Sequence, residues 1–505
     1  MTKKLAVWSW LVVAAVGLLV VVLVFALNLF GRLNAAQTLI DDLNPAFTAE
    51  RVAGDRAGID VLSAAVDTVD PVITAEGGAS AEVPQLISFV SRQTGLSEAA
   101  VLNALKTNFP KTTGLLTALP LSDVSAEIPR LVQFLATTLK LSPDQVLAAL
   151  QQNFPKLAQA VTNLPKATAG WNKVPGTENL TRFDGSPVNT VPQIRDYFSQ
   201  DVIPVLESQQ EGFRALDTRG GVGFLAPLLL ILGIIVIVFG ILMAVLAGSS
   251  GGLPKPIALT GWAVVAVVGV VVVLLVFALN LFTRLGGGQE VLDTARPAFA
   301  AERVAGDVAA IEMVDTVVKT FDPVVTEQGG AAAEVPKLVG FVSQQAGLTQ
   351  PQVLAALQQN FPKTLGLLTA LPLSGVTAEL PKLVDFLVAT LKVSPEVVAA
   401  ALRDAFPKIG QAVANLPKVT AGWNNVPNAE GLTRFDGSPV TTVPQVATYF
   451  KQDVIPAVGR QQANFVKVDT TWPPLTVFAP LLLVLGIIVV VYGLLMLLVT
   501  RRSNE

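Results

Sequence analysis

The sequence contains no cysteine and no histidine in 505 residues. Without cysteine there are no disulfides and no thiolate nucleophiles, and without either residue the usual ligands of zinc and the commonest general base are missing. A dominant charge is missing too, because 35 Lys and Arg face 38 Asp and Glu. No basic surface is therefore available to hold a polyanion. We expect no metal, no cofactor, no nucleic-acid partner and no enzymatic activity.

Long hydrophobic runs, by contrast, are abundant, and 51% of the residues are hydrophobic. Four runs, residues 6–30, 225–246, 257–282 and 477–499, carry no charged residue and exceed the roughly 20 residues that cross a bilayer as a helix. Basic residues flank them at Lys3 and Lys4, at Lys255, and at Arg501 and Arg502. The positive-inside rule then places both termini and the central linker in the cytoplasm, which predicts a multi-pass protein of the plasma membrane that contacts its lipids.

The second half of the chain repeats the first at an offset of 252 residues. Residues 25–30, 50–55 and 181–188 recur at 277–282, 302–307 and 433–440. Each half contains two spans, so both halves should enter the membrane in the same orientation. We interpret the chain as a tandem duplication and expect the halves to form an intramolecular pseudo-dimer.

A shorter repeat of 45 residues lies inside each half. It combines a Glu-x-Pro motif with a Phe-Pro-Lys motif, as in Glu82-Val83-Pro84 and Phe109-Pro110-Lys111, and it occurs four times. Apolar residues follow helical spacing, and Ser97 and Ser142 are typical helix N-caps. Repeats of this size usually form one supersecondary unit, here a group of two or three short helices.

These patterns predict an all-α integral membrane protein with four transmembrane helices and two extracytoplasmic helical domains, each containing two sub-repeats of about 45 residues. The expected divisions are a tail and first span (1–30), a first outer domain (31–222, sub-repeats 81–125 and 126–170), a second span (223–248), a cytoplasmic linker (249–256), a third span (257–282), a second outer domain (283–476, sub-repeats 333–377 and 378–422), a fourth span (477–499) and a tail (500–505).

One loop in each half is the strongest candidate interaction site. A charged pair beside an aromatic, on a loop rich in Gly and Pro, could bind a polar headgroup or a partner. Turn chemistry explains the same residues, with the Arg paired to the Asp and the aromatics packing the loop down, and we favour this structural interpretation. The candidate residues are Trp171, Asn172, Arg182, Phe183 and Asp184, with Trp423, Asn424, Arg434, Phe435 and Asp436 in the second half.

Two other motifs have simple structural interpretations. Glu50, Arg51 and Asp55, repeated as Glu302, Arg303 and Asp307, could pair carboxylates for acid–base chemistry, but this spacing is typical of a solvated or ion-paired helix face. The Phe-Pro-Lys motif is typical of a helix stop followed by a lysine that reaches solvent.

Three functions remain. The first is a non-enzymatic protein of the bacterial cell envelope that presents paired helical domains for interaction with another envelope protein or for self-association. The second is an accessory of envelope lipid transport that binds a lipid or another apolar ligand. A carboxylate-based enzyme ranks last, because no catalytic motif is present.

Overall fold

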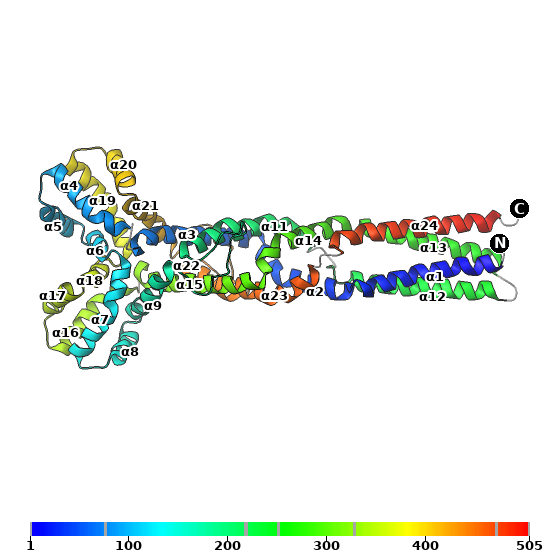
Figure 1. Ribbon diagram of the computed structural model, residues 1–505, viewed down its shortest axis with the longest axis horizontal. Coiled ribbons are helices and arrows are strands. Elements are labelled where there is room, and N and C mark those ends of the chain that lie inside the picture. Colours follow the sequence, from blue (N-terminus) through cyan, green and yellow to red (C-terminus); the bar gives the residue numbers. More distant parts are fainter. Residues whose placement is uncertain are drawn as a thin grey trace. The chain divides into compact units, whose positions relative to one another are not determined.

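The computed structural model describes residues 3–74, 78–216, 221–249, 253–326, 330–469 and 473–502. Within these ranges the chain is all-helical, as predicted, and extended pairing is limited to the isolated bridges Thr181–Pro187 and Thr433–Pro439. Helices α13 to α24 follow the same order along the chain as α1 to α12 (Figure 1).

The chain forms two compact units, and neither unit corresponds to one half. Unit 1 comprises Met1–Thr48, Val205–Ala301 and Ala457–Glu505, and unit 2 comprises Ala49–Pro204 and Glu302–Pro456. Residues 49–204 and 302–456, which make up most of the two outer segments, thus lie together in unit 2.

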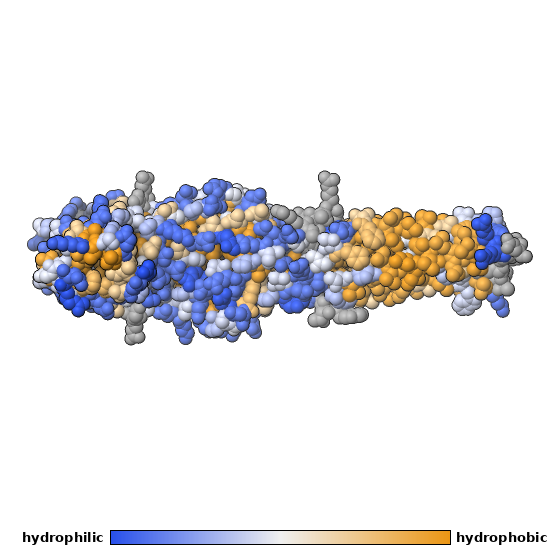
Figure 2. Space-filling model, turned by 90° about the horizontal axis from the view of Figure 1, so that it is seen from above, coloured by the Kyte–Doolittle hydropathy of each residue, from blue (hydrophilic) through white to orange (hydrophobic). Residues whose placement is uncertain are grey.

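Among the described residues, four helices are long and apolar enough to cross a membrane, as the apolar runs predict, and all four lie in unit 1. Figure 2 shows their hydrophobic surface as a continuous orange band. The helices of this unit are α1 (Lys3–Ala26), α2 (Leu29–Leu43), α11 (Ile203–Leu216), α12 (Leu225–Gly248), α13 (Lys255–Ala278), α14 (Leu281–Ala295), α23 (Ile455–Val468) and α24 (Phe478–Arg502), with short η1 (Asn44–Phe47), η3 (Arg296–Phe299) and η6 (Leu475–Val477).

The first span helix is shorter than its apolar run. That run continues to Phe30, but α1 ends at Ala26, because Asn28 adopts a left-handed conformation (φ 48°) and α2 begins after it. Asn280 does the same after α13. Asparagine tolerates this conformation better than most residues, so each asparagine separates a span from the helix that follows.

Glycines bring the span helices together in two pairs, α1 with α12 and α13 with α24. A Cβ atom built on Gly240 would lie 2.6 Å from the backbone nitrogen of Ala14, and one built on Gly493 would lie 2.7 Å from that of Ala266. No larger residue fits at these contacts without a shift of the backbone. The small residues therefore allow close helix approach within each pair.

A stacked pair of tryptophans joins the two helix pairs. The rings of Trp10 and Trp262, which are equivalent in the repeat, lie 3.6 Å apart with an interplanar angle of 8°. Met243, Ala244 and Val265 pack around them in one buried cluster. The contact between the two pairs is thus concentrated on one bulky aromatic core.

Outside the span helices, buried arginines of unit 1 form hydrogen bonds between the two halves. Arg32 of α2 is buried and donates hydrogen bonds to the carbonyl oxygens of Val468 (3.2 Å) and Pro473 (3.0 Å). Val468 is the last residue of α23, so the guanidinium binds the negative end of that helix. Arg284 of the second half in turn donates to the carbonyl of Gly221 in the first half at 2.7 Å.

In unit 2, each half contributes a long helix, then two successive groups of three helices, and finally a short helix. The first half contributes α3 (Ala49–Ile73), α4 (Ala79–Thr94), α5 (Glu98–Asn108), α6 (Pro110–Ala118), α7 (Leu121–Leu139), α8 (Pro143–Asn153), α9 (Pro155–Trp171), α10 (Val191–Tyr197) and η2 (Phe198–Val202). The second half contributes α15 (Ala301–Val325), η4 (Ala331–Ala333), α16 (Val335–Ala346), α17 (Gln350–Asn360), α18 (Pro362–Ala370), α19 (Leu373–Leu391), α20 (Pro395–Ala405), α21 (Pro407–Gly422), α22 (Val443–Tyr449) and η5 (Phe450–Val454).

Each 45-residue repeat forms a module of three helices. Module 1 is α4–α6, module 2 is α7–α9, module 3 is α16–α18 and module 4 is α19–α21. Ser97 and Ser142 cap the second helix of their modules as predicted, since each side chain accepts a hydrogen bond from the third helical residue. The second helix ends before the Phe-Pro-Lys motif, as predicted, and the third helix begins directly at its proline.

The modules pair across the two halves into two lobes (Figure 1). Module 1 packs with module 4 around Val90, Val101, Leu387 and Val398. Edge-to-face phenylalanine contacts mark both pairings: Phe89–Phe406 and Phe109–Phe386 in the first lobe, and Phe134–Phe361 and Phe154–Phe341 in the second. Each lobe therefore needs residues from both halves.

Candidate functional site

The candidate loops at residues 181–187 and 433–439, called here the Arg-Phe-Asp loops, begin after buried tryptophans. The indole nitrogen of Trp171 donates to Asp70 at 2.8 Å, and that of Trp423 donates to Asp322 at 3.1 Å. Both indoles are fully buried, whereas Asn172 and Asn424 are exposed. The tryptophans thus hold the ends of α9 and α21 in unit 2, and they are inaccessible to a ligand.

The arginine of each loop is paired, but with a different aspartate from the expected one. Arg182 makes a bidentate ion pair with Asp201 at 2.7 and 3.1 Å, and Arg434 makes the same pair with Asp453 at 2.9 Å. The expected pairing with Asp184 is wrong. A bidentate pair fixes both the position and the orientation of the guanidinium.

Asp184 and Asp436 instead shape the turn. Asp184 accepts hydrogen bonds from the backbone nitrogen (2.9 Å) and the hydroxyl (2.6 Å) of Ser186, and Asp436 repeats this with Ser438. These hydrogen bonds lower the pKa of Asp184 below its ordinary value. The favoured interpretation as turn chemistry therefore describes these two residues correctly.

Each loop also binds an arginine from the opposite half. The guanidinium of Arg303 lies 4.9 Å from the ring centre of Phe183 and donates to the carbonyl of Thr181 at 2.6 Å. Arg51 lies 5.0 Å from the ring centre of Phe435 and donates to the carbonyl of Arg434 at 2.9 Å. Through these cation–π and hydrogen-bond contacts, each loop binds the long helix of the other half.

Asp55 and Asp307 are buried, so a solvated helix face, one of the two expected arrangements, is wrong for these two residues, whereas Glu50 and Glu302 are exposed. Their exposed fractions are 1% and 6%. Burial raises the pKa of Asp55 from 3.8 to about 8 and that of Asp307 to about 7, against the opposing effects of Arg51 and Arg303. Helical spacing alone could not show that the other half covers this face.

A tyrosine from the opposite half faces each buried aspartate. Tyr197 hydrogen-bonds to Asp307, and the charge of Asp55 acts on Tyr449. Burial raises the pKa of both phenols, so both stay protonated and can act as hydrogen-bond donors. Aspartate, arginine, tyrosine and phenylalanine thus form one buried cluster at each of two equivalent places in unit 2.

One set of polar contacts in unit 2 was not recognised from the sequence. They are four glutamate clamps, in which the Glu of a Glu-x-Pro motif accepts hydrogen bonds from the first backbone N–H groups of the helix that begins at a Phe-Pro-Lys motif in the other half. The clamps are Glu82 on Ile409 (2.9 Å), Glu127 on Thr364 (2.8 Å), Glu334 on Leu157 (2.9 Å) and Glu379 on Thr112 (2.8 Å).

Helix physics explains why a carboxylate lies at each of these positions. The first N–H groups of a helix have no partner within it and carry a partial positive charge, so an anion is stabilised there. Proline occupies the first position and the preceding phenylalanine provides no capping oxygen, so the cap comes from the other half. The signal in the sequence was the fourfold recurrence of both motifs together.

No group of three or more acidic residues that could hold a metal ion occurs within the described ranges. Among the described residues, the glutamate clamps and the contacts of Arg51 and Arg303 with the loops join the two halves. The bidentate pairs Arg182–Asp201 and Arg434–Asp453 lie within one half each. Comparison with protein-family models, with characterised proteins and with solved structures gives no significant match.

Proposed function

We propose that the protein is a non-enzymatic scaffold of the cell envelope, which is anchored by four spans and presents a two-lobed helical head for interaction with another envelope protein or for self-association. One observation carries the proposal. The motifs that recur in the sequence form contacts between the halves: Glu-x-Pro and Phe-Pro-Lys in the clamps, and the Arg-Phe-Asp loops on Arg51 and Arg303. The repetition of these motifs is explained by their role in holding the helical lobes together, and no catalytic role is needed to explain it.

The same contacts favour an origin by tandem duplication of a protein that dimerised. Arg51 binds the second loop and Arg303 binds the first, and the clamps are equally reciprocal. Such exchange of identical contacts is what a two-fold dimer interface would leave after fusion of its subunits. We further propose a bacterial plasma-membrane protein with cytoplasmic termini and extracytoplasmic lobes, an orientation that the basic residues at the span ends favour.

The lobes offer apolar residues to a partner. In modules 1 and 3, the turn between the first two helices exposes Leu96 (45%) and Leu348 (37%). Each follows a glycine with positive φ, Gly95 or Gly347, which ends the preceding helix. Figure 2 shows hydrophobic surface on a lobe beside hydrophilic residues, the pattern expected of an interaction patch.

A photo-crosslinking experiment in native membranes tests the scaffold. Benzoylphenylalanine would replace Leu96 or Leu348, with the exposed polar Gln93 on the same lobe as Leu96 as the matched control. We expect one defined protein adduct, either a second copy or another envelope protein, at the leucine positions and little at Gln93. Equal yields at all three positions, or no adduct at the leucines, would refute the proposal that these lobes bind a protein.

The second candidate function is binding of a lipid or another apolar ligand. Two cavities within unit 2 measure only about 50 and 80 Å³, and each gives little room for such a ligand. A larger apolar cavity lies among the spans of unit 1, and this observation keeps the lipid candidate in view.

A further inference from the structure

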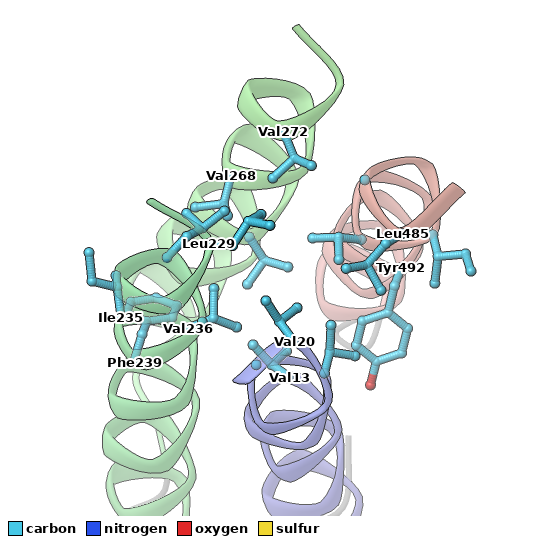
Figure 3. Close-up of a pocket in the computed structure, with 18 of the residues that line it drawn as sticks. Val13, Val20, Leu229, Ile235, Val236, Phe239, Val268, Val272, Leu485 and Tyr492 are labelled. Carbon is cyan, nitrogen blue, oxygen red and sulfur yellow. The ribbon is translucent and has the colours of Figure 1, made fainter. Parts of the chain in front are cut away.

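A cavity of about 170 Å³ separates the two pairs of span helices. Val13 and Val20 of α1, Val236 of α12 and Val268 of α13 line the space between the helices (Figure 3). The lining exposes no polar surface. Its hydroxyl-bearing residue, Tyr492 of α24, donates that hydroxyl to the carbonyl of Ser9 at 3.1 Å.

The cavity follows from the side chains at the contact between the pairs. Stacked Trp10 and Trp262 fill the space between α1 and α13 at one level. One turn and more further along, α1 presents Val16 and Val20 to the space, and α13 presents their repeat equivalents Val268 and Val272. The stacked indoles hold α1 and α13 apart. Valine is much shorter than tryptophan, so the valines at these levels cannot fill the space between the two helices.

Its surroundings decide what can enter the cavity. It lies among helices that cross a membrane and is partly open, so hydrocarbon chains surround it. Water gains nothing there, because a buried water needs two to four polar partners. An apolar cavity of about 150 Å³ is large enough to hold benzene, so this one has room for a chain segment of several carbons.

A second apolar cavity extends the first. It measures about 40 Å³ and shares Val20, Leu229, Leu482 and Leu485 with the larger one. It continues along α1, then past the end of that helix to Leu27, and on to Leu33 of α2. The two cavities thus follow the direction of the span, which suits an extended chain better than a compact ligand.

We propose that the cavity between the two helix pairs binds an acyl chain of a membrane phospholipid as a structural ligand. This site goes beyond the scaffold proposal, since it lies in unit 1 and needs no protein partner. It also gives a specific form to the lipid-binding candidate. The acyl chain fills the space that the valines leave. It thereby contacts both helix pairs at the levels where the tryptophan stack does not reach.

The test uses full-length protein reconstituted into vesicles of phosphatidylglycerol and phosphatidylcholine, with phosphatidylcholine carrying a diazirine in the middle of one acyl chain. The protein is extracted in mild detergent, washed and only then irradiated, so retained lipid alone reacts. Mass spectrometry locates the labelled residues. We expect label on residues that line the cavity, such as Val20, Val236 and Val268.

Two variants of neighbouring residues make the control. Val268→Trp fills the cavity, whereas Val267→Trp adds the same side chain on a residue that is 59% exposed. We expect Val268→Trp to reduce cavity labelling about tenfold or more, because losing room for two methylene groups already changes a binding constant by about that factor. Val267→Trp should leave it unchanged.

The outcomes separate cleanly. Label confined to outward residues of the wild-type protein, or equal loss in both variants, would overturn the proposal. If Val268→Trp does not fold, the wild-type map decides alone. The scaffold proposal is tested on the lobes, so either proposal can fail without the other.

Discussion

Raising the pH from 5 to 7 should weaken unit 2 through Asp55 and Asp307. In the folded chain burial raises their pKa values to about 8 and about 7, whereas in the unfolded chain both return to about 3.8. Between those values the folded state binds more protons than the unfolded state, so stability falls as the pH rises. The stability is fully present below about pH 4 and is lost as the pH rises through 7 to 8.

The size of the effect follows from the number of protons. A difference of one bound proton changes the free energy of unfolding by about 1.4 kcal/mol per pH unit. Two aspartates give a slope of roughly 3 kcal/mol per pH unit, and a loss of about 5 kcal/mol between pH 5 and 7. That loss is comparable to the whole stability of many domains, which is about 5–15 kcal/mol.

Pulse proteolysis in urea measures this slope for unit 2 within the full-length protein. The protein would be held in detergent at pH 5, 6 and 7, and cleavage would be mapped to peptides of α3 and α15. The control is the double variant Asp55→Asn with Asp307→Asn, whose amides do not titrate. We expect the variant to lose the slope and to exceed the wild-type protein in stability at pH 7.

Two results would refute the reasoning. A wild-type protein with no pH dependence over this range would mean that the two carboxyl groups are not held in the neutral form. A double variant with the wild-type slope would assign the pH dependence to other groups.

Three further predictions concern contacts between the halves and within them. Glu127→Ala should lower the free energy of unfolding by about 1–3 kcal/mol in urea titration, because it leaves buried helix N–H groups unpaired, and exposed Glu98→Ala should not. Arg182→Ala with Arg434→Ala should lower stability by a similar amount, since each breaks a bidentate pair; partner crosslinking lost without loss of stability would instead make these loops a binding site. Residues 1–252 alone should insert and self-associate, and a monomeric half in nanodiscs would contradict the dimer origin.

Local features of the fold were predictable from the sequence, and contacts between distant segments were not. The spans, the module helices and the caps at Ser97 and Ser142 depend on nearby residues, and the structure contains them. The sequence also marked the Arg-Phe-Asp loops as ordered turns. It could not identify Asp201 as the partner of Arg182, because proximity in sequence favoured Asp184.

The errors share one physical cause. Asp55 was assigned to solvent because its own helix gives no sign that residues of the opposite half, among them Tyr449, cover it. Glu127 was likewise treated as part of a repeat motif, although its hydrogen-bond partner Thr364 lies 237 residues away. Burial of a polar side chain depends on such distant neighbours, and hydrophobic periodicity describes only the helix on which the residue lies.

The pairing of modules across the halves also sets the order in which the lobes can be completed during synthesis. Modules 2 and 3 are the inner pair, with clamps that span 177 and 237 residues, whereas the clamp from Glu82 to Ile409 spans 327. At about 5–20 residues per second, α4 waits roughly 15–65 seconds for its partner to be made. Val90 and Val101 lack their partners throughout this delay. Once the chain through residue 372 has emerged from the ribosome, the inner lobe should already resist protease, and only a longer emerged chain should protect the outer one.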